Sequence, residues 1–452
     1  MSSSESEDGG GRARAEGPSS SRRRRRRSVN GVWPENFIEA LATQVAIDAA
    51  RTEGRLAAAP ALYNLFQVCS TWRAVSRSDL LWQNLTRRIW NRHRRLHDTW
   101  RDEFVFRHVT SRNFLAARYV HTTLHFVPSD DDNNHNNDNN NVREGRLSCR
   151  RLALSDHYLA AGFSDGSVRL FHLPAGFHLS TLRPHHRDDR LGRFSRAVSG
   201  IILSDNRVVF ASLDGDVHVA PTNDGLPPRR AQWGDVVNDG ALVDFSGCDR
   251  WWVGLYAGVP GRAFHVWNGE TEELVFVGGS LTDPAAVMGW HLLNELTDFV
   301  GRVRVTSHES AVACTSHRFI VFDLGNLGLV LADEELQRGL IVSSVDAADD
   351  AFVAVDSRGG AIVRRVSTLE ELFAFNVRGA SQRVLLGCMN LGYVLMCSGG
   401  VLRLWDWEGE NGRYLYFLRE RVGEVSAMVA DDRHVAACVS DNTIHLWDFG
   451  AQ

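Results

Sequence analysis

The chain has no lysine: all 50 of its basic residues are arginine, in a sequence of 452 residues. This absence excludes chemistry that depends on a lysine amine, such as Schiff-base catalysis or the lysine of a Walker A phosphate-binding loop. GC-rich codon usage, which also favours alanine and glycine, is the simplest origin of the bias. The exclusion holds whatever that origin is.

Cysteine is sparse, and long apolar runs are lacking altogether. The seven cysteines form no CxxC pair and no cluster at metal-ligand spacing, so we expect buried free thiols and no metal or other cofactor. No apolar run approaches the roughly 20 residues that span a bilayer, and the first residues form no apolar signal core. With a formal net charge of −5, these absences predict a soluble intracellular protein that neither enters membranes nor binds nucleic acid nonspecifically.

The first segment, residues 1–29, consists mainly of Ser, Gly, Glu and Arg. It has too few large apolar side chains to offset the entropy of ordering, so we predict a disordered tail. The tail ends in an unbroken basic run made of Arg22, Arg23, Arg24, Arg25, Arg26 and Arg27. Such a run is typical of a nuclear-import signal, and a merely solvated tail is the alternative. We therefore expect the protein in the nucleus.

Residues 30–118 carry the periodicity of amphipathic helices. Apolar residues recur every three to four positions in three stripes, the spacing of one helix face. The stripes are Phe37, Ile38, Leu41 and Val45; Leu62, Leu65, Phe66, Cys69 and Trp72; and Leu81, Trp82, Leu85 and Ile89. Asp79 is expected to cap the third helix, and Thr99 with Asp102 resembles a capping box that begins a fourth. We therefore predict a small all-α region here.

From about residue 147 the pattern changes to short strands between turn signals, and it repeats. Seven segments share one order: an apolar strand, a turn, a second apolar strand, a polar turn, and an alternating strand that usually closes on an aromatic residue. The closing positions, about 40 to 55 residues apart, are Phe171, Ala220, Trp267, Phe322, Arg365, Trp405 and Trp447. This period is typical of four-stranded propeller blades. Residues 147–452 are therefore predicted to form an all-β seven-bladed propeller, with eight blades as the alternative.

The last repeat ends after its third strand, so its fourth strand must come from elsewhere in the chain. Residues 119–128 include a strand-like segment, His121–Val127, directly before the repeats. We predict that it pairs with the last blade and closes the ring, which removes sheet edges that invite aggregation. The Asn- and Asp-rich residues 129–146 are predicted to form a disordered loop, and Thr282–Arg302 to insert a short helix.

Two motifs in the helical region carry a family resemblance. Val68-Cys69-x-x-Trp72-Arg73 and Leu81-Trp82-x-x-Leu85, which follow Trp33-Pro34-Glu35, resemble the F-box. The chain departs from the family pattern in having Trp33 in place of leucine and an Ala-rich insertion at residues 48–60. The resemblance implies docking on a Skp-type adaptor and, through it, on a cullin. The residues expected to contact the adaptor are Pro34, Phe37, Ile38, Leu41, Leu65, Val68 and Leu81.

The strand region carries a second resemblance. Leu404-Trp405-Asp406 and Leu446-Trp447-Asp448 resemble WD repeats, although earlier copies lack the Gly-His that usually opens one. Taken whole, including segments such as Gly192–Ile201 and Arg421–Ala436, the chain is similar to a plant family that joins an F-box to a WD-like propeller. The implied fold class is an α+β multidomain chain. The implied function is recruitment of a nuclear regulatory protein for ubiquitination in flower and organ growth, and such proteins have also been described as transcriptional regulators.

No nucleophile and base pair emerges from the sequence, so we expect a non-catalytic substrate receptor and not an enzyme. Cys69 lies on an apolar helix face, where its thiolate is disfavoured. The connections between blades are rich in arginines, namely Arg183, Arg187, Arg190, Arg193, Arg196, Arg378, Arg383, Arg419 and Arg421. Their planar forks favour carboxylates and phosphates, so we expect an acidic or phosphorylated protein target. A solvated rim of mixed charge is the alternative, because Asp188, Asp189, Glu420 and Glu424 lie among them.

Two other functions stay open at this point. A nuclear propeller scaffold or transcriptional co-regulator without ligase activity would not bind the adaptor. Direct nucleic-acid binding through the arginines would depend steeply on salt, but the net charge of −5 makes it the weakest of the three. For a ligase receptor, the missing lysines predict resistance to self-ubiquitination.

Overall fold

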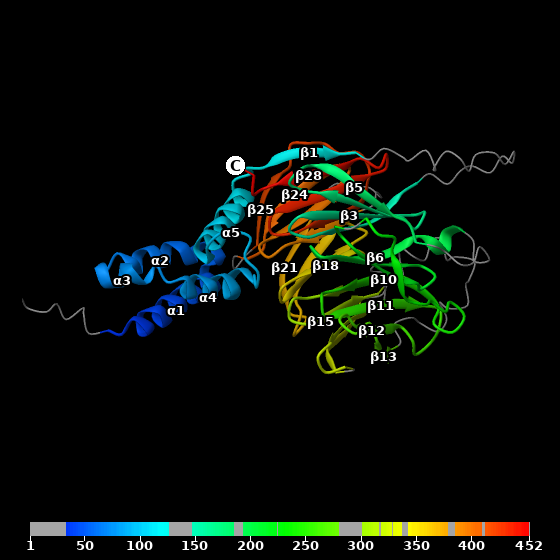
Figure 1. Cartoon of the computed structure of the whole chain (residues 1–452), viewed down its shortest axis with the longest axis horizontal. Helices are drawn as coiled ribbons and strands as arrows, with labels where there is room; N and C mark the ends of the chain where they lie inside the picture. The colour runs from blue at the N-terminus through cyan, green and yellow to red at the C-terminus, as the bar shows by residue number, and fades with distance from the viewer. Residues whose placement is uncertain are drawn as a thin grey trace, which may run out of the picture.

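The computed structural model describes residues 33–125, 147–184, 193–223, 225–279, 301–315, 318–327, 329–336, 342–377, 385–408 and 412–451. These residues form an elongated molecule with a helical region at one end and a ring of sheets at the other (Figure 1). Among the helices that they form, none is long and apolar enough to cross a membrane. The predicted loop at 129–146, the basic tail and the helix expected within Thr282–Arg302 lie outside the described residues, apart from the last two residues of that insertion.

The helical region is built from short helices with identifiable ends. They are α1 (Glu35–Glu53), the 3-10 turn η2 (Arg55–Ala57), α2 (Ala58–Phe66), α3 (Ser70–Val75), α4 (Asp79–Trp90) and α5 (Trp100–Leu115). The Ala-rich insertion prolongs α1 to Glu53, and Gly54, at φ 91°, then turns the chain in a conformation that favours glycine. The predicted Thr99 cap is confirmed, because its Oγ1 accepts a hydrogen bond from the Asp102 N–H at 3.1 Å.

The expected cap of α4 is wrong by one residue. Ser78 is the capping residue, and its side chain accepts a hydrogen bond from the Leu81 N–H at 3.4 Å. Asp79 is the first residue of the helix, and its Oδ1 accepts a hydrogen bond from the Trp100 N–H at 3.0 Å. Serine and aspartate are both good caps, so the local sequence does not distinguish them. Asp79 instead ties the start of α4 to the start of α5.

Seven four-stranded sheets follow, one for each blade. From the innermost strand outward, blades 1 to 3 are β2 (Cys149–Leu154), β3 (Tyr158–Phe163), β4 (Val168–His172), β5 (Phe177–Leu182); β6 (Val198–Leu203), β7 (Arg207–Ser212), β8 (Val217–Pro221), β9 (Arg229–Gln232); and β10 (Ala241–Gly247), β11 (Trp251–Ala257), β12 (Phe264–Asn268), β13 (Leu274–Gly278). Blades 4 and 5 are β14 (Arg302–Val305), β15 (Ser310–Cys314), β16 (Arg318–Asp323), β17 (Val330–Glu335); and β18 (Val342–Ala348), β19 (Ala351–Asp356), β20 (Gly360–Arg365), β21 (Glu371–Asn376). Blades 6 and 7 are β22 (Leu386–Met389), β23 (Tyr393–Ser398), β24 (Val401–Asp406), β25 (Arg413–Phe417); and β26 (Val425–Ala430), β27 (His434–Val439), β28 (Ile444–Asp448), β1 (Val120–Leu124). The seven-blade prediction is confirmed.

Strand β1 closes the ring, as the short last repeat predicts. It pairs antiparallel with β28, from Val120 opposite Asp448 to Leu124 opposite Ile444. The first strands of neighbouring blades contact one another all the way round, including β26 of blade 7 against β2 of blade 1. The ring therefore joins a strand that precedes the repeats to the last strand of the chain (Figure 1).

The strand register shows the repeat more exactly than the sequence does. In every blade the closing position of the third strand pairs with the second residue of the second strand, as Trp405 pairs with Val394 and Trp447 with Val435. In blade 5 the residue at this position is Arg364, opposite Phe352, so the prediction of Arg365 is wrong by one. That blade has no aromatic residue at the position, and two adjacent arginines leave the sequence pattern ambiguous.

Charged side chains connect several first strands around the axis of the ring. Asp244 pairs with Arg151 at 3.1 Å and with Arg304 at 2.8 Å, and Arg304 reaches Asp346 at 3.5 Å. Burial would raise the pKa of Asp244, but the arginines outweigh it and lower that pKa. The pKa of Asp346 is raised, because burial dominates there. This network stabilises blades 1, 3, 4 and 5 against one another and needs no ligand to explain it.

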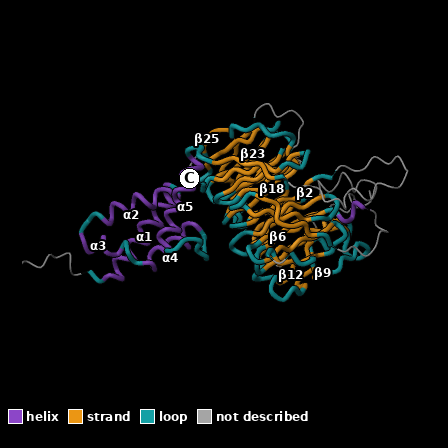
Figure 2. The backbone as a smooth tube through the Cα atoms, turned by 45° about the horizontal axis from the view of Figure 1, so that its top comes forward, coloured by secondary structure: helices purple, strands orange, loops and turns teal. Residues whose placement is uncertain are grey.

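The two faces of the ring differ. The turns between first and second strands, which hold Asp156, Asp349 and Asp431, lie on the face that the helical region covers. The fourth strands end and the first strands begin on the opposite face, which we call the mouth. Figure 2 shows the helices grouped at one side of the strands. The helical region and the mouth therefore lie at opposite sides of the ring.

Candidate adaptor surface and propeller mouth

The helical region leaves large apolar side chains exposed although its core is well packed. Its buried cluster runs from Ile38 to Phe104, with Leu85 fully buried and Trp82 nearly so, as the stripes predict. Around this core, six large apolar residues are 45–65% exposed; one is Val105 of α5, and the five that precede α5 are Trp33, Phe37, Tyr63, Val68 and Leu80. The rings of Trp33 and Phe37 stack with their centroids 4.6 Å apart. We call these five residues the apolar surface; such a set on a monomer is typical of a protein-binding site.

The residues predicted to contact an adaptor divide into two groups. Pro34, Phe37 and Val68 are exposed, and Leu41 is half-buried. Ile38, Leu65 and Leu81 are buried in the helical core and support the apolar surface from beneath. Tyr63 and Leu80 do not appear in the prediction, because a periodic pattern assigns every apolar residue to the chain's own core. They could have been found only by counting the apolar side chains of the region and noting that one small core cannot bury them all.

A groove of about 550 Å³ lies between α2, α4 and α5. Leu62, Phe66, Trp82 and Phe104 form its apolar floor, and the Trp82 and Phe104 rings lie 5.1 Å apart between centroids. The other lining residues include the exposed Tyr63 and the cationic or polar side chains Arg73, Arg101, Gln67 and His108. Burial lowers the pKa of His108, so its ring is neutral at physiological pH and its Nε2 can donate to the Leu56 carbonyl at 3.3 Å. The groove suits an apolar side chain of a partner helix.

Three arginines of the helical region bind carboxylates on the adjacent face of the propeller. Arg55 Nε lies 2.8 Å from Glu408 Oε1, and Arg92 pairs with Asp156. Arg107 lies 3.8 Å from Asp156 and is held by Glu103 at 2.8 Å within α5. These pairs are largely buried, so they are weakly screened by salt and fix the orientation of the two parts.

Aromatic stacking also holds the helical region against the propeller. Phe114 of α5 stacks on Phe449 with centroids 3.7 Å apart and on Tyr393 with centroids 5.0 Å apart. Asn113 donates to the Phe449 carbonyl at 2.8 Å, and Tyr393 donates to the Ser111 carbonyl at 2.7 Å. We call these contacts, with the arginine pairs, the joint. Through them α5 is continuous with the packing of blades 6 and 7.

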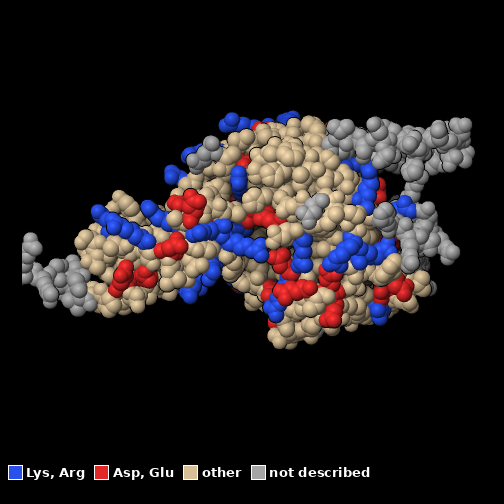
Figure 3. All heavy atoms as spheres, in the orientation of Figure 1, with Lys and Arg blue, Asp and Glu red and all other residues tan. Residues whose placement is uncertain are grey.

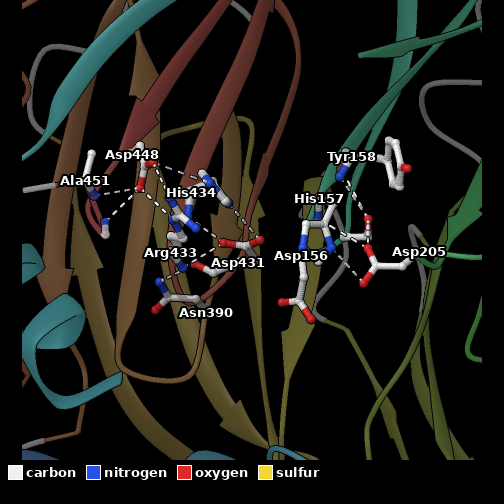
Figure 4. Close-up of polar contacts among 12 residues, drawn as sticks. Asp156, His157, Tyr158, Asp205, Asn390, Asp431, Arg433, His434, Asp448 and Ala451 are labelled. Carbon is white, nitrogen blue, oxygen red and sulfur yellow. Dashed lines mark hydrogen bonds and ion pairs between the residues drawn. The ribbon is translucent and has the colours of Figure 1, made fainter. Parts of the chain in front are cut away.

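Polar side chains in the turns of the covered face hold one another in place. Figure 4 shows Asp431, His434 and Asp448 together in blade 7, and His157 against Asp205 between blades 1 and 2, at 3.1 Å. Burial would raise the pKa of Asp431, but His434 and the backbone N–H groups of residues 433 and 434 lower it to about 2. Asn390 Nδ2 donates to the Asp431 carbonyl, Arg433 Nε to Asp448 Oδ1 and the His434 N–H to Asp431 Oδ1, so these polar groups have partners within the protein. We interpret the cluster as structural.

The structure describes the side chains of only four of the nine arginines predicted for the mouth, namely Arg183, Arg196, Arg419 and Arg421. Arg187, Arg190, Arg378 and Arg383 lie outside the described residues, as does the side chain of Arg193. Arg183 is exposed and Arg196 half-buried on the connection between blades 1 and 2. Arg419 and Arg421 are exposed on the connection between blades 6 and 7. Because blades 7 and 1 separate the two connections, the described arginines form two groups and not one cluster.

The second of these groups has an aromatic neighbour and a buried cation. Phe417, 59% exposed, precedes Arg419 at the end of β25 and pairs across the sheet with Arg403. Nη1 of Arg403, a half-buried residue, is itself buried and has no hydrogen-bond partner among the described residues. A buried donor without an acceptor is costly, so an anionic ligand here would gain affinity from satisfying it. Figure 3 shows arginines and carboxylates interspersed over the side of the propeller that faces the viewer.

The described residues hold no metal-ligand cluster of three or more His, Cys, Asp or Glu side chains. All seven cysteines are free. Burial raises the pKa of Cys149, Cys314 and Cys388, so their thiols stay protonated. These cysteines are packing residues.

Comparison with known proteins gives one close relative and a fold. No model of a known protein family matches the chain. The chain is 57% identical over 430 residues to an Arabidopsis thaliana protein named transcriptional regulator STERILE APETALA, and the alignment covers 94% of each sequence. Among solved structures, it resembles U3-55K with a TM-score of 0.51 and the RRP9 WD40 repeats with a TM-score of 0.50. Both structures are 12% identical to this chain, and each comparison covers 68% of it. The comparisons cover 97% of the U3-55K chain and 96% of the RRP9 chain. At this identity they support the propeller fold alone.

Proposed function

This chain belongs to the STERILE APETALA family of plant proteins, and from that premise we propose that it is the substrate-receptor subunit of a Skp–cullin–F-box ubiquitin ligase. In this role it binds a Skp-type adaptor through its helical region and a nuclear regulatory protein through its propeller. Its biological setting is flower and organ growth. It is a receptor and performs no catalytic step itself.

The observation that carries the proposal is the apolar surface next to F-box motifs. Trp33, Phe37, Tyr63, Val68 and Leu80 remain exposed although the core beneath them is complete. A standard protein interface buries about 800 Å² on each partner, and a few large side chains supply most of its energy. Five such side chains and a groove beside Tyr63 match helix-in-groove recognition.

The joint supports the receptor role because it makes the molecule a fixed spacer. A ligase receptor acts by proximity: it raises the effective concentration of a target near the activated ubiquitin. That effect is smaller if the two binding surfaces move freely with respect to each other. The Arg55–Glu408 pair and the Phe114–Phe449 stack oppose such motion.

The mouth is the surface that we propose for the target. The group of Phe417, Arg403, Arg419 and Arg421 combines an exposed aromatic residue with arginine forks. This combination suits an acidic or phosphorylated segment, since arginine binds carboxylates and phosphates in a bidentate manner. Replacement of Arg419 and Arg421 by glutamate is expected to abolish target capture while adaptor binding remains; unchanged capture would remove this part of the proposal.

The experiment that tests the ligase role is a pull-down of the full chain with a purified Skp-type adaptor. The wild type is compared with Val68→Asp/Leu80→Asp, which charges two exposed positions without disturbing the buried core. Val120→Asp, at a residue of similar exposure (48%) in the propeller, is the control. We expect binding by the wild type and the control and at least tenfold weaker binding by the double variant, the usual effect of losing two anchors. Failure of folded wild type to bind the adaptor would contradict the ligase role.

The second candidate is a nuclear scaffold or transcriptional co-regulator without ligase activity. The Arabidopsis relative is named a transcriptional regulator, which is the observation in favour of this candidate. It uses the same propeller mouth but predicts no adaptor binding, so the pull-down distinguishes the two candidates.

A further inference from the structure

The connection between β9 and β10, residues 233–240, carries the two most exposed large apolar side chains among the described residues of the mouth. Trp233 is 62% exposed and Val237 is 84% exposed. Figure 2 shows β9, which leads into this connection, on the side of the ring away from the helices. Large apolar side chains that stay in water at a rim of polar residues indicate a contact surface for another molecule.

Hydrogen bonds hold this connection in a closed turn. Asp235 Oδ1 accepts from the N–H groups of Val237 and Asn238, at 3.2 and 3.1 Å, and its Oδ2 accepts from the Asn238 side chain at 2.6 Å. The Asp239 N–H donates to the Asp235 carbonyl at 2.8 Å. Because the backbone that presents Val237 is already ordered, binding a partner would cost little further backbone entropy.

The connection is packed between turns of blades 2 and 3. The Gly234 N–H donates to Asp216 Oδ1 at 2.9 Å, and a Cβ at position 234 would lie 1.9 Å from the Asp214 carbonyl oxygen. On the side of blade 3, Arg262 Nε donates to Asp239 Oδ1 at 2.8 Å. These contacts join residues of both blades into one continuous surface.

The ring of Trp233 already binds one cation. The guanidinium of Arg230 lies over it, 4.0 Å from the ring centroid, and Arg230 Nε lies 3.1 Å from Asp216 Oδ2. Because this arginine is paired with a carboxylate, it does little to repel a further cation. The indole face is the best aromatic acceptor of a cation, and most of this ring is exposed to a partner.

The charges of this surface favour a basic partner. Arg230 and Arg262 each pair with an aspartate of the surface itself. Exposed Asp235 and half-buried Asp214 form no ion pair among the described residues. Hydrogen bonds from Asn238 lower the pKa of Asp235, so its carboxylate stays ionised at neutral pH. An arginine or lysine of a partner would gain an ion pair here, whereas an acidic segment would be repelled.

We propose that residues 233–240 bind a basic segment of the target protein. An Arg or Lys side chain of that segment lies against Trp233 and Asp235, and a neighbouring apolar residue lies against Val237. The inference rests on the proposed function in one respect, since it takes the mouth as the target surface. Blades 7, 1 and 2 separate this connection from the one with Arg419 and Arg421. A target held at both places carries a basic part and an acidic or phosphorylated part.

The first test uses the full chain and fluorescent model peptides of about 12 residues, roughly 40 Å long when extended. The probe contains Leu and Arg in equal number; one comparison peptide has Glu in place of Arg, and the other has Ser in place of Leu. We expect the Leu/Arg peptide to bind about tenfold more tightly than the other two, as measured by fluorescence anisotropy. Equal binding of the Leu/Glu peptide would overturn the charge argument, and equal binding of the Ser/Arg peptide would overturn the apolar one.

Matched variants locate the binding. Trp233→Ala is compared with Trp33→Ala, because Trp33 is also exposed (50%) but lies in the helical region. Asp235→Asn is compared with Asp323→Asn, because Asp323 accepts the same set of hydrogen bonds in the turn after β16. Asparagine removes the charge and keeps a side-chain oxygen for the turn. We expect Trp233→Ala to weaken Leu/Arg binding about tenfold and Asp235→Asn about threefold, with both controls unchanged. Equal effects within either pair would overturn the proposal.

Other occupants of the connection give different results. A wild-type dimer, seen by light scattering, that Trp233→Ala converts to a monomer would overturn the proposal in favour of a second copy of the chain. Residues 280–300 follow blade 3 in the chain. A variant with a Gly/Ser stretch of equal length in their place, binding the Leu/Arg peptide about tenfold more tightly than the wild type, would overturn it in favour of that segment.

The site and the ligase role fail separately. A chain that binds the Leu/Arg peptide through Trp233 and does not bind the adaptor would remove the ligase role and support this site. A chain that binds the adaptor and does not bind the Leu/Arg peptide would overturn this inference alone.

Discussion

The helical region and the propeller solve the problem of burying apolar side chains in different ways. The helices share one cluster around Leu85 and Phe104, and that cluster covers only one side of α1 and α2. The propeller distributes its core over several clusters between neighbouring blades, such as the one around Trp252 and the one around Trp405. A single small cluster cannot bury every apolar side chain of the helices, so some of them stay exposed. In a closed ring each blade is packed against a neighbour on both sides, which buries both of its faces. The difference supports the proposal that the helical region binds a partner helix and that the propeller binds a target at its surface.

The largest expected effect comes from breaking the joint between the two parts. Phe114→Ala would remove a fully buried ring that stacks on Phe449 and Tyr393. Such deletions cost about 3–5 kcal/mol. In urea denaturation we expect the single transition of the wild type to divide into separate transitions of helices and propeller. One transition with an unchanged midpoint would show that the two parts do not depend on each other.

Loss of one charged partner in the joint is expected to have a somewhat smaller effect. Arg55→Met leaves the Glu408 carboxylate buried without its arginine, a change that costs about 3 kcal/mol for a buried pair. Burial already raises the pKa of Glu408, so the cost should shrink at acid pH, where the carboxyl takes up a proton. The double variant Arg55→Met/Glu408→Gln serves as the control and should recover part of the loss. A double variant as unstable as the single one would contradict this explanation.

The next prediction concerns the stability of the propeller at acid pH. The pKa of Asp431 is lowered to about 2 from an ordinary value of 3.8, so its contribution is present above about pH 4 and is lost as the pH falls toward 2. The shift corresponds to roughly 2 kcal/mol. Asp431→Asn should remove that part of the acid sensitivity, measured as unfolding free energy against pH. A variant with the same acid profile as the wild type would show that other carboxyls are responsible.

The smallest effect is expected within the helical region. Arg95 and Asp79 form an exposed ion pair 4.0 Å apart, with about half of each side chain accessible. Exposed pairs contribute between 0 and about 1 kcal/mol, and salt screens them. Arg95→Ala should therefore shift the thermal midpoint by no more than a degree or two. A larger loss would mean that Asp79 needs Arg95 to keep its hydrogen bond to Trp100.

Features of the fold that depend on neighbouring residues could be predicted from the sequence. The blade count follows from a regular period, and the closing strand follows from a last repeat that is one strand short. The capping box at Thr99 is a pattern of four residues. The position of Arg364 was missed because that blade lacks the aromatic residue that marks five of the others, and either of two adjacent arginines fits the pattern.

Features that depend on distant residues could not be predicted. Arg55 and Glu408 are separated by 353 residues, and no local pattern connects them. Leu80 and Leu81 are adjacent identical residues, yet one is 57% exposed and the other 1%. Helix periodicity places them 100° apart but does not say which direction faces the core and which faces a partner. The candidate site was therefore predicted in its region but only in part in its residues.

The closure of the ring by β1 has a consequence for synthesis of the protein. His121 of β1 and its neighbour His445 of β28 are 324 residues apart in the chain. While the polypeptide is being made, the helical region and β1 leave the ribosome long before the strand that β1 must join. A message that ends early would yield a ring with two open sheet edges, which aggregate or attract chaperones and proteases. The pairing of β1 with β28 thus acts as a check that the propeller has been translated to its end.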